Sequence, residues 1–196
     1  VELTLALVDD PRLPIVSFTG SDVVGFDLAA RAPRKKVILE LGGDAAAIVC
    51  DDFKSDADLA WVAKRVATFS MYQAGQSCIS VQRLLVAEDL ADRLIPMVVA
   101  EVRALGGGSA AQPGDSVGPV IDESSAQRLE AWIQEAVSSG AQLLCGGRRE
   151  GTYVEPTVLR EIPEATSLGH NEAFGPVLGI RTFRMVEEAF EIVNSS

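Results

Sequence analysis

Residues 15–43 decide the fold class, and they read IVSFTGSDVVGFDLAARAPRKKVILELGG. The apolar run Ile15–Phe18 predicts a buried strand, because β-branched and aromatic residues followed by a Thr-Gly turn are typical of strand ends. Asp22–Arg31 predicts a helix, and Val37–Leu41 predicts a second strand. A strand, a helix and a strand in succession favour an α/β fold with parallel strands.

The same alternation of strands and helices continues downstream. Further strands are expected at Ala45–Cys50, Val81–Val86, Leu143–Cys145, Val154–Leu159 and Val177–Phe183. Further helices are expected from an N-cap at Ser55 to about Gln73, at Leu90–Leu105, at Ser124–Ser138 with a C-cap at Gly140, and at Val186–Val193, with a loop at 106–109. The predicted class is therefore α/β, a mostly parallel sheet flanked by helices.

Charge and cysteine usage exclude several kinds of partner. The 196 residues carry a net charge of −11, which argues against nucleic acid and against anionic membranes. No apolar run approaches the roughly 20 residues of a membrane helix, and the sequence shows no signal peptide. Three cysteines without a CxxC pair, together with a single histidine, favour neither a disulfide framework nor a metal site. A reducing cytoplasmic location is expected.

A glycine turn lies between the first predicted strand and helix. Gly20-Ser21 opens the turn and Gly25 follows inside the predicted helix. Backbone amides and a helix N-terminus at such a place can hold a phosphate group. The pattern is neither a P-loop nor GxGxxG, and a purely structural turn is the alternative.

Two residues are candidates for catalysis. Cys78 lies between a predicted helix and a predicted strand, where a thiol can be exposed, whereas Cys50 and Cys145 lie in apolar strands and are expected to pack as small hydrophobes. A cysteine nucleophile needs a base or a lowered pKa. Glu40 ends an apolar strand, where a carboxylate is unfavourable unless it is paired or functional, so it is a candidate general base. An inert thiol and a solvent-facing carboxylate are the alternatives.

A third cluster spans residues 170–176. Glu172 and Phe174, two residues apart, could point the same way, with the carboxylate on a ribose hydroxyl and the ring beside a flat ligand. An ordinary surface loop is the alternative reading.

Together these segments resemble the aldehyde dehydrogenase superfamily, over nearly the whole chain. The motifs that carry the resemblance are Phe18-Thr19-Gly20-Ser21 with Gly25, Leu39-Glu40-Leu41-Gly42-Gly43, Gly75-Gln76-Ser77-Cys78 and Glu172-Ala173-Phe174-Gly175-Pro176. One departure is Asp44, which stands where the family commonly has lysine.

The resemblance implies an oxidation of a small-molecule aldehyde to a carboxylic acid with NAD or NADP. Cys78 would attack the carbonyl and pass through a thiohemiacetal and a thioester, and Glu40 would activate the hydrolytic water. The implied cofactor-binding residues are Gly20, Ser21, Gly25 and Leu41 near the dinucleotide, with Ser21 on the pyrophosphate, Glu172 on the nicotinamide ribose and Phe174 beside the nicotinamide. A homo-oligomeric parent protein is also implied.

The resemblance also implies a division of the chain. Residues 1–43 are expected to be the C-terminal tail of a dinucleotide-binding domain, and residues 44–196 an aldehyde dehydrogenase-like catalytic domain. Sequence would then be missing at both ends, and the 196-residue chain alone is expected to be inactive.

Three other functions stay open at this point. A cysteine-dependent ester hydrolase would need His170 as its base. A non-catalytic binding or structural protein could share the fold. A variant that releases acyl-CoA belongs to the same family, and Glu40 argues for hydrolysis instead.

Overall fold

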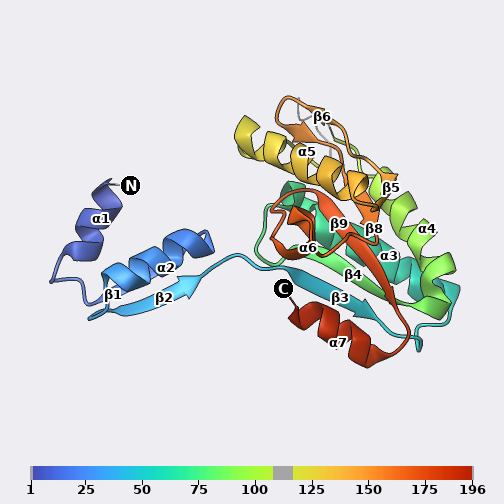
Figure 1. The fold of residues 1–196 in the computed structure, drawn as a ribbon, viewed down its shortest axis with the longest axis horizontal. Helices are drawn as coiled ribbons and strands as arrows, with labels where there is room; N and C mark the ends of the chain where they lie inside the picture. The colour runs from blue at the N-terminus through green and yellow to red at the C-terminus, as the bar shows by residue number, and fades with distance from the viewer. Residues whose placement is uncertain (1, 108–116, 196) are drawn as a thin grey trace. The chain divides into compact units, whose positions relative to one another are not determined.

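The computed structural model describes residues 2–107 and 117–195 (Figure 1). The chain divides into two compact units, Val1–Gly43 and Asp44–Ser196. No helix in the described part of the chain is both long and apolar enough to span a membrane.

The first unit contains α1 (Glu2–Asp9), β1 (Ile15–Thr19), α2 (Asp22–Arg31) and β2 (Lys36–Glu40). The two strands pair in parallel, as predicted, and their register sets Thr19 opposite Glu40. A small apolar core forms around Leu28 of α2 and Val8 of α1. The short helix α1 was not expected from the sequence.

The second unit is built on a five-stranded sheet, which Figure 1 shows with its covering helices. Its strands, in spatial order, are β3 (Ala45–Val49), β4 (Val81–Ala87), β9 (Val177–Phe183), β8 (Thr157–Arg160) and β5 (Gln142–Cys145). The first four strands are mutually parallel and only β5 pairs antiparallel, so the prediction of a mostly parallel sheet is confirmed.

Helices cover this sheet and share the core with its strands. They are α3 (Asp56–Met71), the short 3₁₀-helix η1 (Tyr72–Gly75), α4 (Glu88–Arg103), α5 (Glu123–Ser138), α6 (Ser167–His170) and α7 (Val186–Asn194). Helix α3 begins at the expected N-cap, where the Asp58 N–H donates to Ser55 Oγ at 3.1 Å. Its buried residues recur at helical spacing and pack against α4 and β4.

One predicted strand is wrong. The expected strand Val154–Leu159 is divided into β7 (Tyr153–Val154), which pairs with β6 (Arg149–Glu150), and β8 of the main sheet. Pro156 lies at the break, where a residue without an N–H cannot contribute to a ladder.

Two smaller expectations also differ from the structure. Helix α5 takes Ser139 as its C-cap, and Gly140 follows it with φ +114°. The four-residue helix α6 was not foreseen. The expected loop at 106–109 lies only partly inside the described residues, where Gly107 forms an isolated bridge with Val117.

Candidate active site

Cys78 lies at the centre of a tight turn between η1 and β4. Gln73, Ala74 and Gly75 have φ values of 52°, 55° and 67°, so three consecutive left-handed residues redirect the chain after α3. The Ser80 N–H then donates to the Ser77 carbonyl at 3.0 Å and closes the turn around Cys78. The Cys78 side chain is exposed, as a nucleophile requires.

The other two cysteines belong to the core, as predicted. Cys145 is buried, and Cys50 is half-buried against the main apolar cluster. Burial raises the pKa of the Cys145 thiol, which makes this sulfur a poor nucleophile.

Side chains anchor the Cys78 turn on both sides. The buried Ser80 hydroxyl donates to the Ser70 carbonyl at 3.2 Å, which ties the turn to the end of α3. The Tyr72 and Ser77 hydroxyls are hydrogen-bonded at 2.5 Å. On the other side, Gln76 Oε1 accepts from the Ile121 N–H at 2.8 Å. In the sequence, Gln76 and Ser77 were identified only as part of the motif that ends at Cys78, and Tyr72 and Ser80 were missed, because their partners are set by the fold and not by the local sequence.

The loop that carries Glu172 lies directly against this turn. A Cβ placed on Gly75 would stand 1.9 Å from the Gly175 carbonyl oxygen, so the two backbones are in contact. The reason is topological: β4 and β9 are parallel neighbours, and the segments that precede parallel strands meet at the same edge. The structure therefore brings the Cys78 turn and the Glu172–Pro176 loop together.

Glu172 and Phe174 are held differently within their loop. Phe174 has φ +46°, a strained conformation for a non-glycine residue that costs about 1–3 kcal/mol, and its ring is 39% exposed. Glu172 is half-buried and interacts electrostatically with Arg128. Burial lowers the pKa of the Arg128 guanidinium, and the negative charges of Glu172 and Asp122 oppose that shift.

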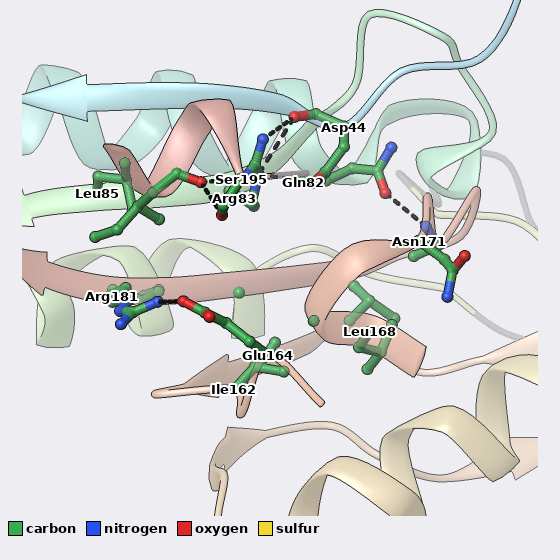
Figure 2. Close-up of a pocket in the computed structure, with 16 residues that line it drawn as sticks. Asp44, Gln82, Arg83, Leu85, Ile162, Glu164, Leu168, Asn171, Arg181 and Ser195 are labelled. Carbon is green, nitrogen blue, oxygen red and sulfur yellow. Dashed lines mark hydrogen bonds and ion pairs between the residues drawn. The ribbon is translucent and has the colours of Figure 1, made fainter. Parts of the chain in front are cut away.

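A cavity of about 60 Å³ adjoins this loop on the sheet (Figure 2). Arg83 forms an ion pair with Asp44 at 2.9 Å, and Arg181 forms one with Glu164 at 2.7 Å. Asp44, which departs from the motif of the family that the sequence resembles, therefore pairs with an arginine of the sheet.

The remaining candidate residues gather in the first unit. The Gly20 N–H donates to the Glu40 carbonyl at 3.1 Å, and Ser21 caps α2 by accepting from the Val24 N–H at 3.4 Å. Gly25 is buried, and a Cβ there would lie 2.5 Å from Leu41 Cδ2. Five predicted residues therefore meet where β1 and β2 end and α2 begins.

This arrangement in the first unit suits a phosphate-bearing ligand. Gly20 and Ser21 are exposed at the N-terminus of a ten-residue helix, at the carboxyl end of a parallel strand pair. Such a place binds anionic groups through backbone N–H groups and the helix dipole. The residues present fit the diphosphate of a dinucleotide.

The candidate residues thus form two groups, one in each unit. Glu40, which has an exposed side chain, belongs to the first group, and Cys78 belongs to the second. A shared site for these two residues stays a prediction. His170, the base required by an ester hydrolase, lies at the end of α6 with Nδ1 2.9 Å from the Glu164 carbonyl oxygen.

Comparisons with known proteins identify the family of the chain. A model described as the aldehyde dehydrogenase family matches residues 2–196. The mitochondrial succinate-semialdehyde dehydrogenase of Arabidopsis thaliana is 36% identical over 200 residues, which cover 100% of this chain and 37% of that protein.

Solved structures give the same result. Aldehyde dehydrogenase 21 from Physcomitrella patens, in complex with the reaction product succinate, is 40% identical with a TM-score of 0.92. The match covers 98% of this chain and 40% of that one. A Mycobacterium tuberculosis aldehyde dehydrogenase complexed with NAD+ is 33% identical, has a TM-score of 0.91, and is matched over 100% of this chain and 41% of that chain. The chain therefore spans about 40% of the length of these relatives.

Proposed function

Because the chain belongs to the aldehyde dehydrogenase family, we propose that the whole protein oxidises a small-molecule aldehyde to a carboxylic acid with NAD or NADP. The observation that carries the proposal is the exposed thiol of Cys78 in a turn packed against the Glu172–Pro176 loop. This contact supports a site in which a nucleophile lies beside the residues proposed to hold the cofactor.

The chemistry proposed for Cys78 proceeds through two covalent intermediates. The thiolate sulfur attacks the aldehyde carbonyl carbon, a C–S bond forms, and the carbonyl oxygen becomes an oxyanion that the Cys78 N–H helps to stabilise. A bound nicotinamide cofactor would supply the acceptor for the hydride that leaves this carbon. Collapse of the oxyanion gives a thioester on Cys78.

Glu40 is the proposed base of the second half-reaction. It takes a proton from a water molecule, whose oxygen attacks the thioester carbon; the C–S bond breaks and the thiolate of Cys78 is restored. Only Leu41–Asp44 lie between Glu40 and β3, and β3 is the neighbour of β4, the strand that follows Cys78. This short separation along the chain supports the proposal.

The proposed cofactor contacts come from both units. Gly20, Ser21, Gly25 and Leu41 serve the dinucleotide, and support for them comes from their gathering at the N-terminus of α2. Glu172 and Phe174 serve the nicotinamide ribose and ring. We accordingly interpret residues 1–43 as the tail of a dinucleotide-binding domain and residues 44–196 as catalytic, in agreement with the boundary between the two compact units.

Cellular location and oligomeric state are further parts of the proposal. The three free cysteines support a reducing cytoplasmic location. A homo-oligomeric whole protein rests on the family resemblance alone, and its substrate is described only as a small aldehyde.

Substitutions in the whole protein test the two catalytic roles separately. Cys78→Ala is expected to lower aldehyde oxidation by at least about 10³-fold. Glu40→Gln is expected to keep a burst of NAD(P)H close to one equivalent per site, followed by a steady state slowed by about 10²–10⁴-fold, because only deacylation needs the base. Stopped-flow absorbance of the reduced nicotinamide measures both.

Matched controls separate this function from ester hydrolysis. Cys50→Ala removes a thiol that follows β3 and lies outside the Cys78 turn. It should leave the rate of aldehyde oxidation within about twofold of wild type. His170→Ala should behave likewise, since its ring is held by the Glu164 backbone. Wild-type turnover in Cys78→Ala, or loss of activity only in His170→Ala, would overturn the proposal.

A further inference from the structure

Both backbone polar groups of one residue in the Glu172–Pro176 loop, Ala173, are held by side chains from other elements. The Ala173 N–H donates to Gln82 Oε1 at 2.7 Å, and the Ala173 carbonyl accepts from Arg128 Nη2 at 2.8 Å. Ala173 is 3% exposed and Gln82 is 5% exposed, so the first of these hydrogen bonds is shielded from water. Figure 2 shows the Gln82 side chain directed at the loop that follows Asn171.

The two side chains that make this clamp stand on regular elements. Gln82 is the second residue of β4 and follows Cys78 by four positions in the chain. Arg128 is on α5, where its guanidinium lies 4.5 Å from the centre of the Trp132 ring. The strand restricts the Gln82 side chain, and the helix and the Trp132 ring restrict the Arg128 side chain. Little conformational freedom is left for them to lose when they bind the loop, so they can fix its position accurately.

The residue held in this way lies between the two residues proposed to meet the cofactor. Ala173 separates Glu172 from Phe174, and this part of the chain is neither helix nor strand. Phe174 keeps its left-handed backbone only while its surroundings enforce it. Holding the peptide groups on both sides of Ala173 therefore fixes the directions in which the side chains of Glu172 and Phe174 leave the backbone.

We propose that Gln82 and Arg128 are positioning residues that fix Glu172 and Phe174 relative to the Cys78 turn through the backbone N–H and carbonyl of Ala173. The inference rests on the proposed function, because it assigns the clamp to the cofactor side of that site. Neither residue touches the reacting atoms. Their loss weakens nucleotide binding while the thiol keeps its reactivity.

Hydrogen exchange of the 196-residue chain tests the clamp without any activity. Gln82→Met, which keeps the length of the side chain and removes the acceptor, is expected to speed exchange of the Ala173 amide about tenfold. Gln82→Glu restores an acceptor oxygen at the same place and should bring the rate back to within about twofold of wild type. Gln127→Met makes the same chemical change on the exposed face of α5 and should have no effect there.

Nucleotide binding by the whole protein tests the positioning role. Calorimetric Kd values for NAD+ and NADP+ are expected to rise about tenfold in Gln82→Met and in Arg128→Met, the loss expected for one buried hydrogen bond. Arg184→Met, which removes an exposed arginine paired with Glu88, is the matched control. The rate of Cys78 alkylation by iodoacetamide should change less than about twofold, while the buried Cys145 reports any general opening.

Each outcome decides the proposal. Unchanged Ala173 exchange in Gln82→Met, or faster exchange with an unchanged Kd, overturns it. Failure of Gln82→Glu to restore either value would show that Gln82 only fills space. If Gln82→Met does not fold, Arg128→Met carries the same two measurements. A wild-type protein that binds nucleotide but oxidises no aldehyde refutes the proposed function, and the Kd values still decide the clamp.

Discussion

The contact between Gly75 and Gly175 gives the sharpest prediction about the site. In Gly75→Ala, the new methyl group would lie 1.9 Å from the Gly175 carbonyl oxygen and 2.4 Å from its carbon. Since non-bonded heavy atoms settle near 3.5 Å, the Cys78 turn and the Glu172–Pro176 loop must separate by on the order of 1 Å. Both obstructing atoms belong to backbone, so no side-chain rotation relieves the clash.

Two contributions set the size of the effect. The backbone at Gly75 has φ +67°, and alanine in that conformation costs about 1 kcal/mol relative to glycine. The steric overlap adds about 1–3 kcal/mol, as overpacking does elsewhere. Since each 1 kcal/mol lowers Tm by about 2–4 °C in a domain of this size, we expect Tm to fall by about 10 °C.

Gly151→Ala provides a matched control for the backbone contribution. Gly151 has φ +59°, close to that of Gly75, but an added Cβ there would meet no atom within 4 Å. It should therefore lower Tm by only about 2–4 °C. Thermal unfolding of the 196-residue chain, followed by far-UV circular dichroism, compares the two variants. Equal losses in both would show that the two loops are not locked together, and the reasoning would be refuted.

Two further predictions concern the supports of the site. Ser80→Ala removes the buried hydroxyl that donates to the Ser70 carbonyl, and we expect the urea midpoint to fall by the equivalent of about 1 kcal/mol; an unchanged midpoint would contradict this anchor. The Asp122 carboxylate accepts hydrogen bonds from the Ser125 N–H and the Ser124 hydroxyl, which lower the Asp122 pKa below its ordinary value of 3.8. A lowered folded-state pKa stabilises the protein above the ordinary value, and that stabilisation is lost as pH falls through the lowered pKa. Asp122→Ala should therefore destabilise the protein at pH 7 in urea titrations, and its difference from wild type should shrink as the pH is lowered through that pKa.

Much of the fold could be predicted from local signals in the sequence. The predicted bounds of Asp22–Arg31 and Val177–Phe183 match the structure, because an N-cap at Ser21 and a proline at Pro176 mark where those elements begin. The strand predicted at Val154–Leu159 failed because the apolar residues at its two ends belong to two different strands separated at Pro156, and α6 is too short to show a helical period.

The candidate site could be predicted only in parts. Cys78 and Glu172 were found as motifs, yet nothing local indicates that Gly75 touches Gly175, because that contact depends on the parallel pairing of β4 and β9. Gln82 and Arg128 were missed for a related reason. Each fits the ordinary pattern of its strand or helix, and its positioning role depends only on a contact with Ala173, which is far away in the chain.

The edge of the five-stranded sheet that carries Cys78 is not the edge at which α/β proteins usually bind ligands. Ligands in open α/β sheets favour the carboxyl ends of the strands, and in this unit a cavity lined by Cys50, Glu88 and Arg184 lies there. The exposed thiol lies instead at the amino ends of β4 and β9. Strained backbone is concentrated at the same edge. Four non-glycine residues in the described part of the chain have positive φ, and three of them, Gln73, Ala74 and Phe174, lie there.

Strained backbone persists only where its surroundings enforce it, and it concentrates at functional sites. The carboxyl edge of β3, β4 and β9 shows an exposed Glu88–Arg184 ion pair, of a kind that contributes little to stability. At the amino edge the backbones of Gly75 and Gly175 are in contact, and side chains hold both the N–H and the carbonyl of Ala173. Thiol labelling distinguishes the two edges: fast modification of Cys78 with slow modification of Cys50 is expected, and the reverse order would move the candidate site to the carboxyl edge.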